Sequence, residues 1–133
     1  MAIGALDLKR RADCLLPGSG VPFVLFFAAV VALLNVGAIL PVRLDLAAVG
    51  AASLCAGGWC AVNFWRCRHA HCVITGTDWL ALAGFTLLEA GLGRSLIHGD
   101  EGLVFLRVLA AGLVFEGVWY VARGTNAVSS RST

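Results

Sequence analysis

The sequence predicts an all-α integral membrane protein, a four-helix bundle with short loops. Of its 133 residues, 59% are hydrophobic and 14% are charged, and its mean hydropathy is +0.87. A water-exposed globule needs more polar surface than such a chain can supply. The charges gather at the two ends and in three short interruptions. Between them lie four apolar runs of about 20 residues, the length that crosses roughly 30 Å of hydrocarbon. We therefore expect one compact membrane domain over residues 21–122.

The two terminal segments differ from this domain in composition. Residues 1–20 are basic, and their apolar positions recur at helical spacing, which favours a short amphipathic helix on the membrane surface. A disordered basic leader is the alternative. The segment lacks the small-residue cleavage site of a secretory signal. Residues 123–133 are rich in Ser and Thr and predict a mobile cytoplasmic tail.

Prolines and polar turns bound the predicted membrane spans. The four spans cover residues 21–40, 46–65, 79–97 and 103–122. Pro41 closes the first span, and Thr77 or Asp78 is a suitable N-cap for the third. In the second span, small residues recur every four positions, a spacing that lets membrane helices pack closely. The pattern supports a bundle with short connections.

Basic residues predict the orientation of the chain. Lys and Arg concentrate before the first span, between the second and third, and after the fourth, whereas the other two loops hold only Arg43. Positively charged flanks stay in the cytoplasm, and with four spans these three segments fall on one side. We expect a multi-pass inner-membrane protein with both termini cytoplasmic. The net charge of +2 gives no indication of nucleic-acid binding.

A Cys/His cluster follows the second span. Cys67, His69, His71 and Cys72 place two thiols and two imidazoles within six residues. Thiolate and imidazole bind Zn²⁺, Cu⁺ and Hg²⁺ rather than Mg²⁺ or Ca²⁺. If the helix continues, Cys67 and His71 share one face, whereas an irregular turn would let all four side chains converge. The alternative to a metal site is a helix-end topology signal with small packing thiols.

Polar side chains are also predicted inside the membrane. They are Arg94, His98 and Arg107 in the outer third, Glu89 and Cys55 near the middle, and Glu116, Cys60 and Asn63 in the inner third. Charged groups at such depth are costly and normally face a partner or a watery cavity. We expect Glu89 to pair with Arg94 or Arg107. We expect Glu116 to pair with Asn63. Such pairs either hold the helices together or line a polar path towards the Cys/His cluster.

One segment of the chain resembles a known pattern. The residues Asn63-x-x-Arg66-Cys67-x-x-x-His71-Cys72-x-x-Thr75-Gly76 resemble a motif of small uncharacterised prokaryotic four-helix membrane proteins. More loosely, the chain is similar to the Mer-type mercuric-ion transport proteins. That resemblance implies a first thiol pair at Cys55 and Cys60, which receives the ion, and a cytoplasmic pair at Cys67 and Cys72. The first span lacks the adjacent cysteines of the best-known members.

These observations predict a small membrane protein that binds or transports a thiophilic metal ion of the Hg, Cu or Zn class. The Cys/His cluster with Cys55 and Cys60 would supply the ligands, and Glu89, Glu116, Asn63, Arg94 and Arg107 would line the path. The alternative is a non-catalytic subunit or oligomeric scaffold of a membrane complex. A third interpretation is a thiol-redox or haem protein, with His98 or His71 as the haem ligand. No nucleophile–base pair or nucleotide motif is evident, so we expect no enzyme. The expected partners are the lipid bilayer, the metal ion, and further copies of the chain or a larger membrane complex.

Overall fold

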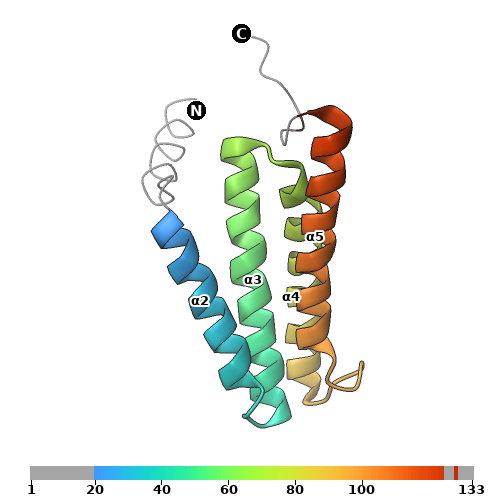
Figure 1. Ribbon diagram of the computed structural model, residues 1–133. Helices are drawn as coiled ribbons and strands as arrows, with labels where there is room; N and C mark the ends of the chain where they lie inside the picture. The colour runs from blue at the N-terminus through green and yellow to red at the C-terminus, as the bar shows by residue number, and fades with distance from the viewer. Residues whose placement is uncertain (1–19, 125–127, 129–133) are drawn as a thin grey trace, which may run out of the picture.

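Four α-helices that run up and down make up the described part of the chain (Figure 1). The computed structural model describes residues 20–124 and residue 128, with only the backbone of Cys67. The helices are α2 (Gly20–Gly37), α3 (Val42–Cys67), α4 (Ala70–Leu92) and α5 (Glu101–Arg123). The most extensive contact joins α3 to α4, while α2 packs on α3 and α5 packs on α4. The predicted all-α architecture with four helices is confirmed.

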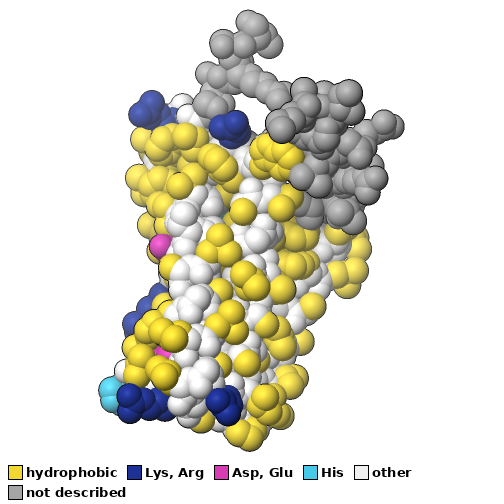
Figure 2. Space-filling model, turned by 180° about the vertical axis from the view of Figure 1, so that it is seen from behind, with side chains coloured by type: hydrophobic (Ala, Val, Ile, Leu, Met, Phe, Trp, Pro, Cys, Tyr) yellow, Lys and Arg dark blue, Asp and Glu magenta, His cyan; other side chains and the backbone are white. Residues whose placement is uncertain are grey.

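The outer surface of the helices is largely apolar (Figure 2). Three helices, α3, α4 and α5, are long and apolar enough to cross a membrane, and α2 is a shorter apolar helix over Val21–Gly37. The predicted basic segment covers residues 1–20, and all of it except residue 20 lies outside the described residues. Most of the predicted tail, residues 125–127 and 129–133, also lies outside them.

The third helix begins much earlier than predicted. α4 starts at Ala70, whereas the sequence analysis placed this start at residue 79, with Thr77 or Asp78 as the N-cap. Thr77 lies inside the helix instead, and its hydroxyl donates to the Val73 carbonyl oxygen at 2.7 Å. Such a bond satisfies a threonine hydroxyl without ending the helix. The Cys/His segment is therefore mostly helical, and only two of its residues form a link.

Arg68 and His69 are the link between α3 and α4. Arg68 adopts a left-handed conformation (φ 54°), which ends α3 at Cys67, and its N–H donates to the Phe64 carbonyl at 2.9 Å. The Arg68 carbonyl accepts the N–H of Val128 at 2.8 Å. A connection of two residues leaves no room for a separate loop, so α3 and α4 run antiparallel and in contact.

The opposite end of α4 also differs from the prediction. The helix stops at Leu92, five residues earlier than expected, because Gly93 takes the left-handed conformation (φ 72°) typical of a helix C-terminus. The Arg43 guanidinium of α3 then donates to the carbonyls of Ala90 (2.9 Å) and Gly91 (3.1 Å). A cation at this end also suits the helix dipole. The contact ties α3 to α4 at the end of the bundle that lies away from the Cys/His cluster.

The core combines small residues on α3 with large aromatic rings from α4 and α5. Ala52 and Ala56 are fully buried, which brings the α3 backbone close to its neighbours. Trp79 of α4 is 1% exposed and stacks on Phe105 of α5, with ring centroids 5.0 Å apart. Its indole N–H donates to the Phe105 carbonyl at 3.2 Å. This aromatic pair fills the interior midway between the two ends of the bundle.

Candidate metal centre

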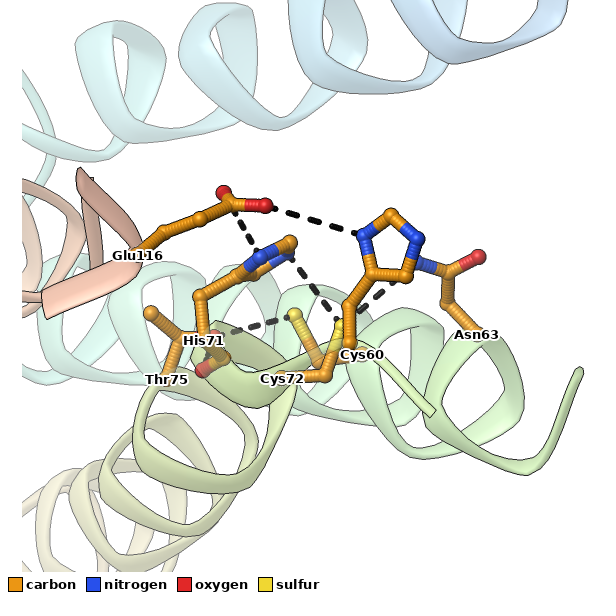
Figure 3. Close-up of polar contacts among 7 residues, drawn as sticks. Cys60, Asn63, His71, Cys72, Thr75 and Glu116 are labelled. Carbon is orange, nitrogen blue, oxygen red and sulfur yellow. Dashed lines mark hydrogen bonds and ion pairs between the residues drawn. The ribbon is translucent and has the colours of Figure 1, made fainter. Parts of the chain in front are cut away.

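Two histidines and a glutamate meet at the end of the bundle where α3 passes into α4 (Figure 3). His69 belongs to the link, His71 to the first turn of α4, and Glu116 to α5. Glu116 Oε2 lies 2.8 Å from His71 Nδ1, and Glu116 Oε1 lies 3.7 Å from His69 Nδ1. All three side chains are half-buried, so the cluster lies at the rim of the bundle rather than in its core.

Close packing of α5 on α4 brings Glu116 to the histidines. Gly112 lies one turn before Glu116, and it faces Thr75, which lies one turn after His71. A methyl group on Gly112 would overlap the Thr75 Cγ2 methyl. Only glycine allows this approach, as at other close contacts between membrane helices. The spacing between the carboxylate and the imidazole therefore depends on this glycine.

The three side chains fit a zinc-class ion. One ligand atom from each of His69, His71 and Glu116 lies within 4.8 Å of the other two. Two imidazoles and one carboxylate form a known zinc ligand set that leaves a fourth position open. Bonds of about 2.0–2.2 Å would place tetrahedral ligand atoms about 3.4 Å apart. Small side-chain movements would bring the observed atoms to that spacing.

Two free thiols lie directly behind this cluster (Figure 3). The Cys72 Sγ lies 3.3 Å from His71 Nε2, the ring nitrogen that faces away from Glu116. The amide of Asn63 donates to the same sulfur at 3.4 Å. The Cys60 Sγ lies 3.3 Å from the Thr75 hydroxyl and contacts the Cys72 thiol. Contacts of this kind fix the tautomer and orientation of a metal-binding imidazole.

A cavity of about 100 Å³ opens beside the cluster. Its polar wall is formed by Cys60, Asn63, His71 and Thr75, and its aromatic wall by Phe23, Phe27, Trp59 and Trp79. The His71 ring therefore borders a space large enough for water or a small ligand.

Comparison with family models, curated proteins and solved structures finds no match for the chain.

Most of the residues predicted for the Cys/His cluster and for the inner third of the membrane lie together. Cys60, Asn63, His69, His71, Cys72 and Glu116 form one cluster around the start of α4. The predicted pairing of Glu116 with Asn63 is wrong, because the carboxylate contacts the two histidines and the Asn63 amide contacts Cys72. Cys55 is exposed on the outer surface of α3 and takes no part. The side chain of Cys67 lies outside the described residues.

The remaining predicted path residues lie elsewhere. Glu89 is near the C-terminal end of α4 rather than at mid-bundle, and its carboxylate accepts the N–H of Leu96. Arg94 and Arg107 are exposed, and neither pairs with Glu89 within the described part of the chain. α4 begins and ends earlier in the sequence than the predicted third span. The positions along the bundle that were assigned to Glu89 and Arg94 from that span were therefore displaced. The predicted pairing of Glu89 with an arginine is therefore wrong.

The sequence analysis assigned no positioning role to two residues that hold the cluster together. Thr75 joins the two helices, because its hydroxyl donates to the His71 carbonyl at 2.8 Å and also contacts Cys60. Gly112 was not singled out among the apolar residues of the predicted fourth span.

Proposed function

We propose that this protein crosses the membrane with four helices and binds a zinc-class metal ion at His69, His71 and Glu116. The single observation that carries the metal proposal is the convergence of these three donors within 4.8 Å. Two of the donors come from the α4 end and one from α5, so an ion would join two helices. The thiols of Cys72 and Cys60 support the choice of a thiophilic ion.

The membrane placement rests on helix length and composition. α3, α4 and α5 each have the length and apolarity for a span. With 18 residues, α2 extends about 27 Å, close to the thickness of the hydrocarbon core. Arg66, Arg68 and Arg123 lie at the end that holds the candidate metal centre. Together with the basic N-terminal segment, they favour a cytoplasmic location for that end.

A single chain would bind the ion at this centre and would not conduct it across the bilayer. Trp79 and Phe105 fill the interior between the candidate metal centre and Glu89. Passage of an ion across the bilayer would require α5 to move away from α4. The residues of the candidate metal centre would hold the ion near the membrane surface. One of them, His71, also borders the cavity.

Metal binding is tested by elemental analysis of the purified protein after equilibration with Zn²⁺. We expect one ion per chain for the wild type. Glu116→Gln and His71→Ala should each weaken binding about 100-fold or more, because each removes one of three protein ligands. His98→Ala and Asp100→Asn are matched controls at the opposite end of the bundle and should bind like the wild type. A wild type without zinc, or Glu116→Gln with unchanged affinity, would contradict the proposal.

A second candidate function is acyl transfer through a thiol. The Cys72 Sγ lies 3.3 Å from His71 Nε2, and His71 Nδ1 lies 2.8 Å from Glu116 Oε2, which is the order of a nucleophile, a base and an orienting carboxylate. A groove of about 270 Å³ between α3 and α4 is bordered by Cys72, Phe64 and Leu80. An acyl chain from the bilayer would fit this apolar wall.

The acyl transfer would use only Cys72, His71 and Glu116. The Cys72 sulfur would bond to the carbonyl carbon of an acyl thioester while its proton passes to His71 Nε2. The leaving thiolate would then take that proton, and Glu116 would hold the ring in place. With a long-chain acyl thioester as the probe, we expect mass spectrometry to find one acyl group on Cys72 in the wild type.

Variants separate this candidate from metal binding. Cys72→Ala should abolish acylation yet lower zinc affinity only about 10–100-fold, as expected for a contact behind the ligands. Cys55→Ala removes an exposed thiol and should leave acylation unchanged. Acylation of Cys55 in place of Cys72 would indicate exposure rather than activation and would exclude acyl transfer.

A further inference from the structure

Two opposite charges lie on the outer surface of the bundle at nearly the same depth. Asp78 of α4 and Arg107 of α5 are both exposed, and neither makes a polar contact with any described residue. His71 faces Glu116 and Thr75 faces Gly112, so α4 and α5 run antiparallel. Residue numbers therefore increase along α4 in the direction in which they decrease along α5. Counted from these pairs, Asp78 and Arg107 differ in depth by about 3 Å.

The depth matters because neither charge is at a helix end. Asp78 lies eight residues after the first residue of α4, and Arg107 lies six residues after the first residue of α5. In lipid, an exposed carboxylate with a short side chain cannot reach the headgroups and needs a partner of opposite charge. Figure 2 shows acidic and basic atoms part-way along one edge of an otherwise apolar face.

On this surface, α5 is covered less by the rest of the bundle than α3 or α4 is. Only 11% of the apolar window of α5 is buried, against 50% for α3 and 39% for α4. Each charge also lies beside an exposed small residue on the same helix face, Ala81 next to Asp78 and Ala111 next to Arg107. Small residues at such positions allow another helix to approach closely.

We infer that two copies of this chain associate through α4 and α5, with Asp78 of each copy opposite Arg107 of the other. Because the two charges share one depth, a two-fold axis along the membrane normal places both pairs in register. Both copies then keep the same orientation in the bilayer. The interface buries four charges as two pairs and covers the exposed apolar side of α5. It is independent of the candidate metal centre, whose ligands all come from one copy.

The wild type is tested first, by its mass in a lipid nanodisc or mild detergent. We expect twice the chain mass of 13.9 kDa. Asp78→Arg leaves two arginines opposite each other and should give a monomer, and Arg107→Asp should do the same with two aspartates. Asp100→Arg, an equal change in an exposed turn, should remain a dimer. A monomeric wild type would overturn the inference whatever the variants do.

Co-expression of the two single variants under different tags then identifies where the pairing occurs. In a mixed dimer, the arginine introduced by Asp78→Arg in one copy meets the aspartate introduced by Arg107→Asp in the other. The two native residues meet as well, so the tags should co-purify. Pairing within one copy would not be restored in this mixture. Failure to co-purify, or single variants that stay dimeric, would therefore overturn the inference. Co-purification also shows that each variant folds, and zinc binding by each variant reports separately on the metal proposal.

Discussion

Gly112→Ala is expected to detach α5 from α4 and to abolish metal binding at the candidate centre. The added methyl would overlap Thr75 Cγ2, and Thr75 is held in place by bonds to the His71 carbonyl and to Cys60. Overpacking of this kind costs about 1–3 kcal/mol in well-packed cores. The displaced α5 would carry Glu116 away from His71. Zinc titration and thermal unfolding in detergent measure the two effects.

Two companion variants show whether this overlap is the cause. Gly117→Ala lies on the same helix with open space around the added methyl, so it should retain both stability and zinc binding. Thr75→Ser in the Gly112→Ala background removes the methyl that clashes but keeps the hydroxyl. We expect the double variant to regain most of the lost affinity. If it binds no better than Gly112→Ala, the α4–α5 contact does not position Glu116 as described.

Trp79→Ala is expected to give the largest loss of stability among single substitutions in the core. The indole is 1% exposed, stacks on Phe105 and donates to the Phe105 carbonyl. Truncation of a buried tryptophan costs about 3–5 kcal/mol through lost contacts and the cavity left behind. Thermal unfolding in a fixed detergent measures the change. Zinc binding should persist below the lowered unfolding temperature, because none of the three ligands contacts this ring.

The contributions of the ring and of its N–H can be separated. Trp79→Phe keeps most of the aromatic packing and should cost about 1 kcal/mol, the usual value of one hydrogen bond. Trp65→Ala is the matched control, since this tryptophan is 40% exposed. A Trp65→Ala variant that unfolds as early as Trp79→Ala would show that tryptophan content, rather than the stack with Phe105, determines stability.

The helical fold was predictable because the composition leaves few alternatives. Four apolar runs of membrane length between charged interruptions specify the number and order of the helices. The helix ends were less predictable. Thr75, Gly76 and Thr77 indicate a turn in isolation, yet the threonine hydroxyls bond within α4, and Gly76 gives α3 the space to approach. Tertiary contact overrides local preference at this point.

The candidate site was predictable in its residue types but not in its geometry. The sequence analysis singled out the segment from Cys67 to Cys72 and placed Glu116 near it, and the structure brings His69, His71, Cys72 and Glu116 together. The partner of Glu116 was not predicted correctly, because it depends on the start of α4 and on the Gly112 contact. Cys55 illustrates the reverse case, since its residue type suggested a ligand, whereas the rotation of α3 places it on the outer surface.

The two-residue link constrains how the protein enters a bilayer during synthesis. A nascent chain with only Arg68 and His69 between α3 and α4 has no segment long enough to pause between them. If α3 and α4 both span the bilayer, they would enter it as one helical hairpin that carries Cys60, Cys72 and both imidazoles together. Glu116 emerges from the ribosome after both histidines, so the three donors of the candidate centre meet only when α5 joins the hairpin.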